Sequence, residues 1–383
     1  MSVSSLFAGK IRFLLVRIIS PAILNGIYFF ISRKERTLLL IKNDGIGDYI
    51  LFRNYLYFLR NSAKYKHHQI YLLANLTGKD LAMHLDAKVI DGFFWYSDSY
   101  FLKWNLVKLL SGLQRLRLET IIYPNYSRKY TTDWLVKNIR AKNKIAVDGD
   151  CINEPVTLKH KTNSYYSELI NVDVVPLHEF DRNKQIFEAL TGEKHQPKSP
   201  VIRRADLPIV PNNSVVIFFD ASSAEKKWSP VNFNTLCRLI LSAFDTNIIL
   251  IGGTNDEQEI AVISNGIPAN KLSNRRGLDL IGLCALIGGA NLLISGDTVA
   301  VHMAAALSVP AVCIAKGDLY GRFVPYPPHV FAKIYTVFPD GYIADRRNYG
   351  QYSSLDINKV RAGEVCQTIK KILTGRESEN RTT

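Results

Sequence analysis

A carboxylate stands just after the first strongly apolar run of the chain. The run TLLLIK (residues 37–42) leads into the turn NDGIGD (residues 43–48) and then into a helical pattern. The two glycines allow a tight turn, which brings Asp48 to the start of the helix. Its carboxylate either caps that helix or projects outward and accepts a proton from a substrate hydroxyl as a general base. The spacing leaves both interpretations open.

A second segment has the residue types of an anion site. FFDASSAEKKWSP (residues 218–230) combines a strand end, a small polar loop containing Ser222, two lysines, and Ser229-Pro230 as the cap and first residue of a helix. Backbone amides, hydroxyl groups and one ammonium can hold a phosphate in such a loop. The alternative is that Lys226 and Lys227 are a solvated pair.

Two more strand ends carry polar groups. Glu257, in IGGTNDEQE (251–259), could bind ribose hydroxyls, although an acidic residue there also favours the helix dipole. In SGDTVAVH (295–302), the amides of a helix start and the Thr298 hydroxyl would form an anion site, with His302 on the same helix face. Taken singly, Asp297 is more typical of a helix cap, and His302 of a hydrogen-bonded helix residue.

Metal and hydrolase motifs give little support to other chemistries. Asp148-Gly149-Asp150 could chelate a divalent cation, but it lies between a strand and an irregular region, which favours a turn. We therefore predict no metal and no cofactor. No H-E-x-x-H, G-x-S-x-G or Walker sequence occurs, which argues against a zinc protease, a serine hydrolase and a P-loop ATPase. Five cysteines, odd in number and far apart, predict a reducing compartment.

The elements that must position these residues form two α/β series. Apolar runs typical of buried parallel strands occupy 37–42, 70–75, 120–125 and 144–147 in the first series, and 214–219, 247–252, 291–295 and 310–315 in the second. Helical patterns lie between them, and a polar, proline-containing stretch joins the series. We expect two Rossmann-like sheets that face each other across a cleft lined by the carboxyl ends of the strands.

The first 36 residues and the charge balance point to a membrane surface. Residues 1–200 carry 29 basic and 18 acidic side chains, and residues 201–383 carry 19 and 16. The apolar stretch 11–31 is interrupted by Arg12, Arg17 and Pro21, so it suits an amphipathic helix lying on anionic headgroups. A spanning anchor and a helix that packs on the domain are the alternatives. Nucleic acid is the least favoured anionic partner, because no zinc finger, RNP signature or basic repeat occurs.

Taken together, these segments resemble glycosyltransferase family 9, the heptosyltransferase-like enzymes of lipopolysaccharide assembly in the bacterial cell envelope, which have the GT-B fold. LLLIKNDGIGDYILFRNYLYFLR is similar to the family's opening strand, Gly-Asp turn and helix. DASSAEKKWSPVNFNTL, ILIGGTNDEQEIA and SGDTVAVHMAAALSVPAVCI are similar to three further family segments, in the same order. The resemblance extends from Thr37 to about Tyr326.

The resemblance implies an inverting, metal-independent transfer of a sugar from a nucleotide-sugar. Asp48 matches the family's general base. The donor-binding residues that it implies are Ser222, Lys226 and Asp297 with Thr298 around the diphosphate, Glu257 on the ribose, and His302 on the supporting turn. The leading expectation is a heptose moved from a nucleotide-diphosphate-heptose onto a lipopolysaccharide core or a similar anionic, lipid-linked glycan. The protein would then be cytoplasmic and peripheral on the cytoplasmic face of the inner membrane.

The resemblance also gives each part of the chain an expected role. We expect a membrane-associating amphipathic segment at 1–36, an acceptor-binding domain at 37–195, a linker at 196–213, a nucleotide-sugar-binding domain at 214–355, a closing helix at 356–373 and a disordered tail at 374–383.

The chain departs from the family pattern at three places. Val299 replaces a glycine after Asp-Thr, Asp220 replaces a glycine near the proposed anion site, and Lys316-Gly317-Asp318 replaces a glycine-proline-threonine turn. A β-branched residue such as Val299 cannot easily adopt a positive φ, and it does not let a phosphate approach as closely as glycine does. Two other functions therefore stay open: a catalytically weakened protein that binds a nucleotide-sugar or glycan, and a nucleotide-sugar epimerase that acts on the donor alone.

Overall fold

The structure, a computed structural model, describes the chain except residues 1–19, 28–33, 100–103, 174–175, 195–196, 209, 211–212, 222, 254–256, 344–347 and 381–383. It divides into two compact units. Unit 1 comprises residues 1–174 and 182–196, and unit 2 comprises residues 175–181 and 197–383. The short segment 175–181 therefore belongs to unit 2, although we predicted that it lies within the first domain.

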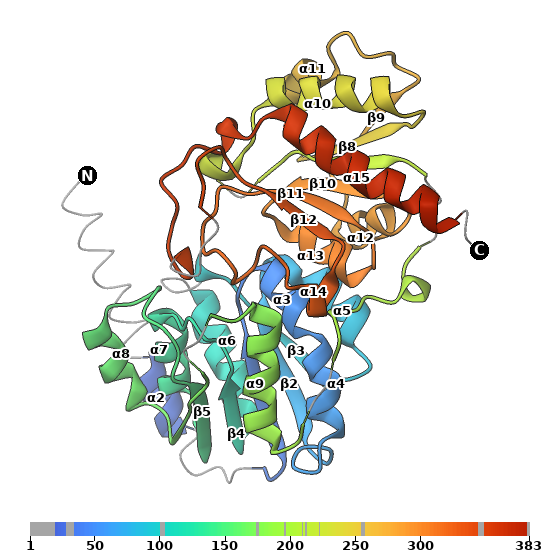
Figure 1. Ribbon diagram of the computed structural model, residues 1–383. Coiled ribbons are helices and arrows are strands. Elements are labelled where there is room, and N and C mark those ends of the chain that lie inside the picture. The colour runs from blue at the N-terminus through green and yellow to red at the C-terminus, as the bar shows by residue number, and fades with distance from the viewer. Residues whose placement is uncertain are drawn as a thin grey trace, which may run out of the picture. The chain divides into compact units, whose positions relative to one another are not determined.

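Unit 1 contains a parallel sheet of six strands in the order β3-β2-β1-β4-β5-β6 (Figure 1). Its central strand β1 is buried along its whole length, which explains its continuous apolar sequence. The strands are β1 (Thr37–Lys42), β2 (Gln69–Asn75), β3 (Gly92–Tyr96), β4 (Thr120–Tyr123), β5 (Asn143–Val147) and β6 (Glu168–Ile170).

The helices of unit 1 pack on this sheet through apolar side chains. Leu39 and Ile41 of β1 share one core with Leu106 of α6 and Leu135 of α7. The helical segment after β1 is divided into two short helices, α3 and α4, which meet at Arg53, whose backbone stays in the αR region. The helices are α2 (Ser20–Ile27), α3 (Ile46–Phe52), α4 (Asn54–Asn61), α5 (Lys79–Asp86), α6 (Trp104–Arg115), α7 (Tyr130–Asn138), α8 (Val156–Asn163) and α9 (Glu179–Thr191), whose first three residues belong to unit 2.

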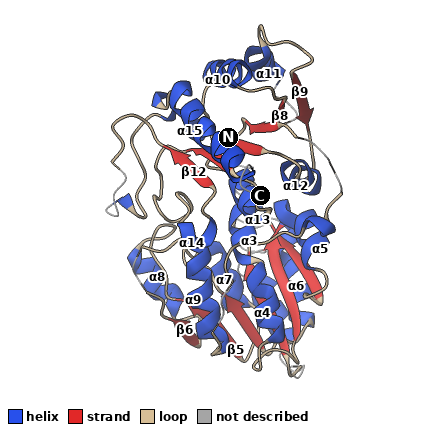
Figure 2. Ribbon diagram, turned by 45° about the vertical axis from the view of Figure 1, so that its right-hand side comes forward, coloured by secondary structure: helices blue, strands red, loops and turns tan. Residues whose placement is uncertain are grey.

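Unit 2 contains a second parallel six-stranded sheet, in the order β12-β11-β10-β7-β8-β9. The strands are β7 (Val215–Phe218), β8 (Ile248–Gly252), β9 (Leu272–Arg276), β10 (Leu292–Gly296), β11 (Ala311–Ile314) and β12 (Ile334–Val337). The two sheets confirm the predicted α/β class with two parallel sheets; Figure 2 shows their strands in red.

The helices of unit 2 cover its sheet in the same way. Helix α15 packs beside α10, as Figure 1 shows, and Ile369 of α15 shares a core with Ile240 of α10 and Ile294 of β10. The helices are α10 (Pro230–Ala243), α11 (Glu257–Ser264), α12 (Leu280–Gly288), α13 (Val299–Ala306), α14 (Pro328–Phe331) and α15 (Ala362–Asn380).

Two segments differ from their predicted form. The closing helix starts at Ala362, after a 3₁₀ turn at Ile357–Lys359, and it continues to Asn380 over most of the predicted disordered tail. The predicted linker is packed on unit 2: Ile202 and Leu207 are buried, and the Ile202 amide donates to the Ala306 carbonyl.

The N-terminal segment is described only in part. Residues 1–19 and 28–33 of the predicted membrane-associating segment lie outside the described residues. Helix α2 contacts α6, and Leu24 packs against the core of unit 1. Within the described part of the chain, no helix is both long enough and apolar enough to cross a membrane.

Candidate active site

Asp48 lies in the first turn of α3 in unit 1. The N-cap position belongs to Gly45, so the interpretation of Asp48 as the N-cap is wrong; Asp48 is the third residue of the helix. A Cβ atom on Gly45 would lie 3.3 Å from Oδ2 of Asp48, which places the half-buried carboxylate over the glycine turn. A carboxylate at a helix N-terminus is stabilised in its charged form by the helix dipole. The charged carboxylate is the form that can accept a proton from a hydroxyl.

The turn that carries Asp48 is held by buried polar contacts. Lys42 is buried at the end of β1, and its ammonium lies 2.9 Å from Oδ2 of Asp44. Nδ2 of Asn43, also buried, donates to Oγ1 of Thr132 in α7 at 2.8 Å. These contacts fix both sides of the turn, so the position of the Asp48 backbone is set by the strand and by α7.

In unit 2, Lys226 and Asp297 come together although 71 residues separate them in the sequence. The Lys226 ammonium lies 3.7 Å from Oδ2 of Asp297. A Cβ atom on Gly296 would lie 3.5 Å from the Lys226 carbonyl oxygen and 3.7 Å from Cγ2 of Thr298. These are ordinary van der Waals distances, so the loop after β7 lies directly beside the end of β10. Lys226, Asp297 and Thr298 form one cluster at the carboxyl edge of the sheet.

The charge of Asp297 is balanced within this cluster. Burial raises the pKa of Asp297, the Lys226 ammonium acts in the opposite direction, and the negative charge of Asp318 raises the pKa further. An ammonium beside a buried carboxylate is available for a more highly charged anion, because a diphosphate attracts it more strongly than a single carboxylate does.

Thr298 is the N-cap of α13. Its hydroxyl accepts a hydrogen bond from the Ala300 amide at 3.2 Å and lies 2.8 Å from the Ser295 hydroxyl. The predicted cap at Asp297 is therefore wrong by one residue. Val299 is the first residue of the helix and does not have a positive φ, so its β-branched side chain causes no backbone strain. The expected backbone strain is therefore absent, whereas the expected effect of the Val299 side chain on the approach of a phosphate stays a prediction.

His302 is a buried residue on α13. Its Nδ1 lies 2.6 Å from the Tyr326 hydroxyl, and burial lowers the pKa of His302 to about 3, so the ring is neutral. His178 stacks obliquely on Tyr326 with ring centroids 4.5 Å apart, and its Nε2 lies 3.0 Å from the Phe323 carbonyl oxygen. Local sequence patterns gave no sign of His178 or Tyr326, because only the folded chain brings them beside α13.

The remaining predicted donor residues have differing surroundings. Glu257 is the first residue of α11, and its exposed carboxylate accepts from Arg276 of β9 at 2.7 Å. Ser222 lies outside the described residues.

The two lysines are not a solvated pair: Lys227 lies 2.8 Å from Glu259 and 3.2 Å from Asp220. The negative charge of Asp220 is thereby offset by Lys227.

The aspartates of the D-x-D sequence stabilise the loop after β5 through contacts with neighbouring residues of unit 1. The Lys159 ammonium lies 2.9 Å from Asp148, and Asp150 accepts hydrogen bonds from the Ser127 hydroxyl and the Ile152 amide. A Cβ atom on Gly149 would lie 1.6 Å from the Tyr126 carbonyl oxygen, so only glycine fits there. Among the described residues, no group of three or more His, Cys, Asp or Glu side chains is arranged to hold a metal ion.

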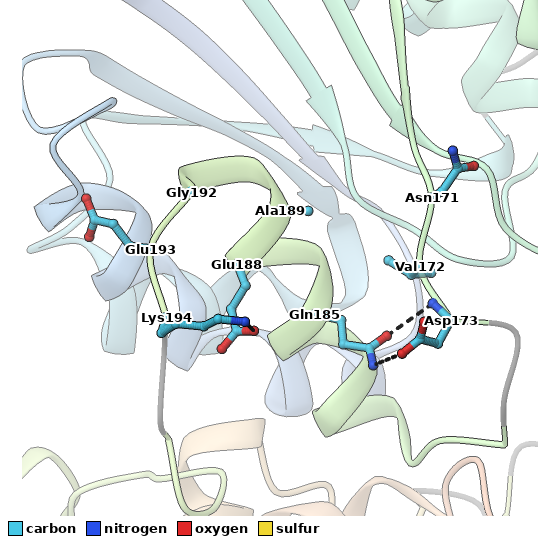
Figure 3. A pocket seen from close by; sticks show the side chains of 9 residues that line it. All are labelled: Asn171, Val172, Asp173, Gln185, Glu188, Ala189, Gly192, Glu193 and Lys194. Carbon is cyan, nitrogen blue, oxygen red and sulfur yellow. Dashed lines mark hydrogen bonds and ion pairs between the residues drawn. The ribbon is translucent and has the colours of Figure 1, made fainter.

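A pocket of about 430 Å³ in unit 1 contains none of the predicted site residues (Figure 3). Its ionisable groups are paired within the unit: Gln185 donates to Asp173 at 2.9 Å, the Lys194 ammonium lies 3.5 Å from Glu188, and Glu193 accepts from the Ala63 amide. Three carboxylates and one ammonium do not suit an anionic ligand. Its lining residues are Asn171, Val172, Asp173, Gln185, Glu188, Ala189, Gly192, Glu193 and Lys194.

Comparison with solved structures shows the fold. A glycosyltransferase of family 9 from Veillonella parvula has a TM-score of 0.69 at 15% identity, with 90% of this chain and 100% of that chain covered. The heptosyltransferase WaaC of E. coli with ADP-2-deoxy-2-fluoro heptose has a TM-score of 0.67 at 14% identity, with 88% and 99% covered. The ADP-heptose lps heptosyltransferase II of E. coli has a TM-score of 0.62 at 13% identity, with 89% and 99% covered.

The sequence comparison adds a family. No curated protein matches the chain. Residues 173–328 match the family model described as glycosyltransferase family 9 (heptosyltransferase), and this range contains Lys226, Glu257, Asp297, Thr298 and His302. Residues 173–328 are therefore similar to the family 9 glycosyltransferases, and the chain has the fold of the solved heptosyltransferase structures.

Proposed function

We propose that the protein is an inverting, metal-independent glycosyltransferase that moves a sugar, with heptose the leading candidate, from a nucleoside-diphosphate donor to a hydroxyl of a lipid-linked glycan. The observation that carries the proposal is the cluster of Lys226, Asp297 and Thr298 at the carboxyl edge of the unit 2 sheet, within the range that matches the family. Two of the solved structures with this fold are E. coli WaaC with ADP-2-deoxy-2-fluoro heptose and WaaC with ADP, which favours a nucleotide donor here.

The proposed reaction is a single displacement at the anomeric carbon. The acceptor oxygen forms a bond to that carbon while the bond to the diphosphate oxygen breaks and its electron pair leaves with the diphosphate. The hydroxyl proton passes to the Asp48 carboxylate. Negative charge grows on the departing diphosphate, and the Lys226 ammonium is a fixed donor of the kind that stabilises such charge. An acceptor of lipopolysaccharide type fits the excess of basic residues in the N-terminal half.

Asp48→Asn tests the reaction. General-base assistance contributes about 10²- to 10⁴-fold to a rate, so we expect the variant to lose transfer by roughly that factor. Donor binding should change little, because the proposed donor residues lie in unit 2. Transfer is measured by mass spectrometry with a panel of nucleotide-sugars and lipopolysaccharide core acceptors, and donor binding by calorimetry.

Asp80→Asn is the matched control for that variant. Asp80 is also a first-turn aspartate of a unit 1 helix, but its side chain is exposed. Normal transfer by Asp48→Asn would remove Asp48 from the mechanism. Donor binding without any transfer by the wild-type protein would instead support a nucleotide-sugar-binding protein, and conversion of the donor without an acceptor would support an epimerase.

A further inference from the structure

The turn after β11 brings a second ammonium to the same edge of the unit 2 sheet. Strands β10 and β11 are parallel neighbours with Gly296 beside Ile314, so Thr298 and Lys316 each follow their strand by two residues. The Lys316 ammonium lies 3.7 Å from Glu225, the residue before Lys226, and 3.4 Å from Asp318. Lys316 therefore lies next to the Lys226 loop.

The turn holds Lys316 in a defined place. Gly317 has φ +99°, and a Cβ atom there would lie 2.2 Å from the Tyr342 ring, whose hydroxyl donates to the Gly317 carbonyl. Asp318 is buried and accepts from the Ser353 amide at 2.8 Å. Only 12% of the Lys316 side chain is exposed. The Lys316 ammonium is thus carried by a turn that contacts with Tyr342 and Ser353 hold in place.

The ammonium groups of Lys226 and Lys316 lie farther from their nearest carboxylate oxygens than the ammonium group of Lys227 does. Lys227 lies 2.8 Å from Glu259, which is the length of a charge-assisted hydrogen bond. The ammonium groups of Lys226 and Lys316 lie 3.4 to 3.7 Å from their carboxylate neighbours, beyond the about 2.7–2.9 Å of such a bond. Neither of these two ammonium groups makes a short ion pair with a carboxylate, and each can bind one of the two charged phosphates of a diphosphate.

The strand order decides which phosphate each lysine would meet. Along the carboxyl edge, the sequence β11-β10-β7-β8 places Lys316 first, then Thr298, then Lys226, and Glu257 last. If the nucleoside lies toward Glu257, as the resemblance to family 9 implies, the phosphate that bears the sugar lies on the far side of the diphosphate from Glu257. That phosphate is nearest to the end of β11.

We propose that Lys316 is a second phosphate-binding residue, which holds the sugar-bearing phosphate of the nucleoside-diphosphate donor. The inference rests on the proposed function. It gives a phosphate-binding role to a lysine in the turn Lys316-Gly317-Asp318, where the sequence departs from the family pattern. Lys316 would stabilise the phosphate oxygen that receives the electron pair when the glycosidic bond breaks. Together with Lys226 it would neutralise charge on both phosphates.

Binding of nucleoside monophosphates and diphosphates tests the assignment. A hydrogen bond to a charged group contributes enough that Lys316→Met should weaken ADP or UDP binding roughly 10- to 100-fold. AMP or UMP binding should change by less than about threefold, because those ligands lack the second phosphate. Lys316→Arg should restore most diphosphate binding, since it keeps the charge. Calorimetry gives the affinities, and thermal unfolding checks that each variant is folded.

Lys271→Met is the control, because Lys271 pairs with Asp245 at 2.7 Å beside the amino ends of β8 and β9. It should bind both nucleotide classes as the wild type does. Equal loss of monophosphate and diphosphate binding by Lys316→Met, or no loss of either, overturns the assignment of Lys316 while the proposed function stands. A wild-type protein that binds no nucleoside diphosphate overturns the proposed function and this inference with it.

Discussion

Glu154 is a buried carboxyl group in unit 1 whose surroundings favour its neutral form. Its side chain is 4% exposed, and neither carboxyl oxygen has a hydrogen-bond partner among the described residues. Burial raises the pKa of Glu154 to about 7, and the negative charge of Asp133 adds to this effect. Asp133 is itself fully buried beside Arg128 and accepts from the Tyr166 hydroxyl. Near neutral pH, the Glu154 carboxyl group is therefore partly ionised in surroundings that favour its neutral form.

We expect Glu154→Gln to change the pH dependence of stability. The pKa of Glu154 is higher in the folded state than in the unfolded state, so its contribution to stability is fully present below about pH 4.3 and is lost as the pH rises through about 7. The neutral amide avoids that loss. The free energy of unfolding of the variant should exceed that of the wild type by about 1 to 3 kcal/mol at pH 8, with a smaller difference at pH 5.

Urea denaturation at the two pH values measures both quantities. Glu168→Gln, at an exposed position, is the control and should show the same difference from the wild type at pH 5 and pH 8. A Glu154→Gln effect that does not grow between pH 5 and pH 8 would show that Glu154 is ionised throughout this range.

The positions of the candidate site residues were predictable from the sequence where a strand, a short turn and a helix follow one another. That local order placed Asp48, Thr298 and Lys226 at the carboxyl edges of their sheets, and the structure has them there. His178 and Tyr326 could not be found in this way, because their packing beside His302 depends on contacts between distant parts of the sequence.

At the level of elements, the four strands that the sequence did not reveal are the four edge strands. β3 and β6 border the unit 1 sheet, and β9 and β12 border the unit 2 sheet. An edge strand has one neighbour and more contact with solvent, so it needs fewer apolar residues. β9, with the sequence LSNRR, is largely exposed and has no apolar run to detect. Most residues of the eight inner strands are buried, which is why each of these strands contains an apolar run.

The turn after β11 offers a test of how an element fixes a functional residue. Gly317→Ala would place a methyl group against the Tyr342 ring and displace it from Phe338, with which it stacks at 4.5 Å. We expect a loss of about 2 to 4 kcal/mol in the free energy of unfolding, from the positive φ and the displaced ring together. Nucleoside-diphosphate binding should weaken too, because Lys316 would move.

Gly341→Ala separates the effect of the positive φ on stability from the effect of the contact with the Tyr342 ring. Gly341 also has a positive φ, +82°, but a Cβ atom there would have no neighbour within 4 Å. It should lose only about 1 to 2 kcal/mol and keep its nucleotide affinity. Denaturation and calorimetry on the same preparations compare the variants. Equal losses of stability for the two would mean that the contact with Tyr342 is unimportant.

At the scale of the whole molecule, charge and exposed apolar side chains suggest a membrane surface as a partner. Most of the net charge of +14 falls in residues 1–200, and α2 exposes Ile23 and Ile27, one helical turn apart, while Leu24 packs on the core. One side of this helix packs on unit 1, as the packing alternative predicts, and another side exposes apolar residues to solvent. Such a helix can insert shallowly among headgroups.

We therefore expect Ile23→Glu/Ile27→Glu to lose affinity for anionic vesicles. The wild type should sediment with phosphatidylglycerol vesicles but not with phosphatidylcholine vesicles, and salt should weaken the binding, because basic side chains and anionic headgroups attract each other over only about 10 Å at 0.1 M salt. Removal of residues 1–34 should abolish binding, but it also uncovers the core beneath Leu24, so the double substitution is the cleaner test. Val231→Glu/Ile343→Glu makes the same charge change at two exposed apolar positions of unit 2 and should bind as the wild type does. If the α2 variant binds phosphatidylglycerol as well as this control does, α2 is only a packing helix and the acceptor must be reached without it.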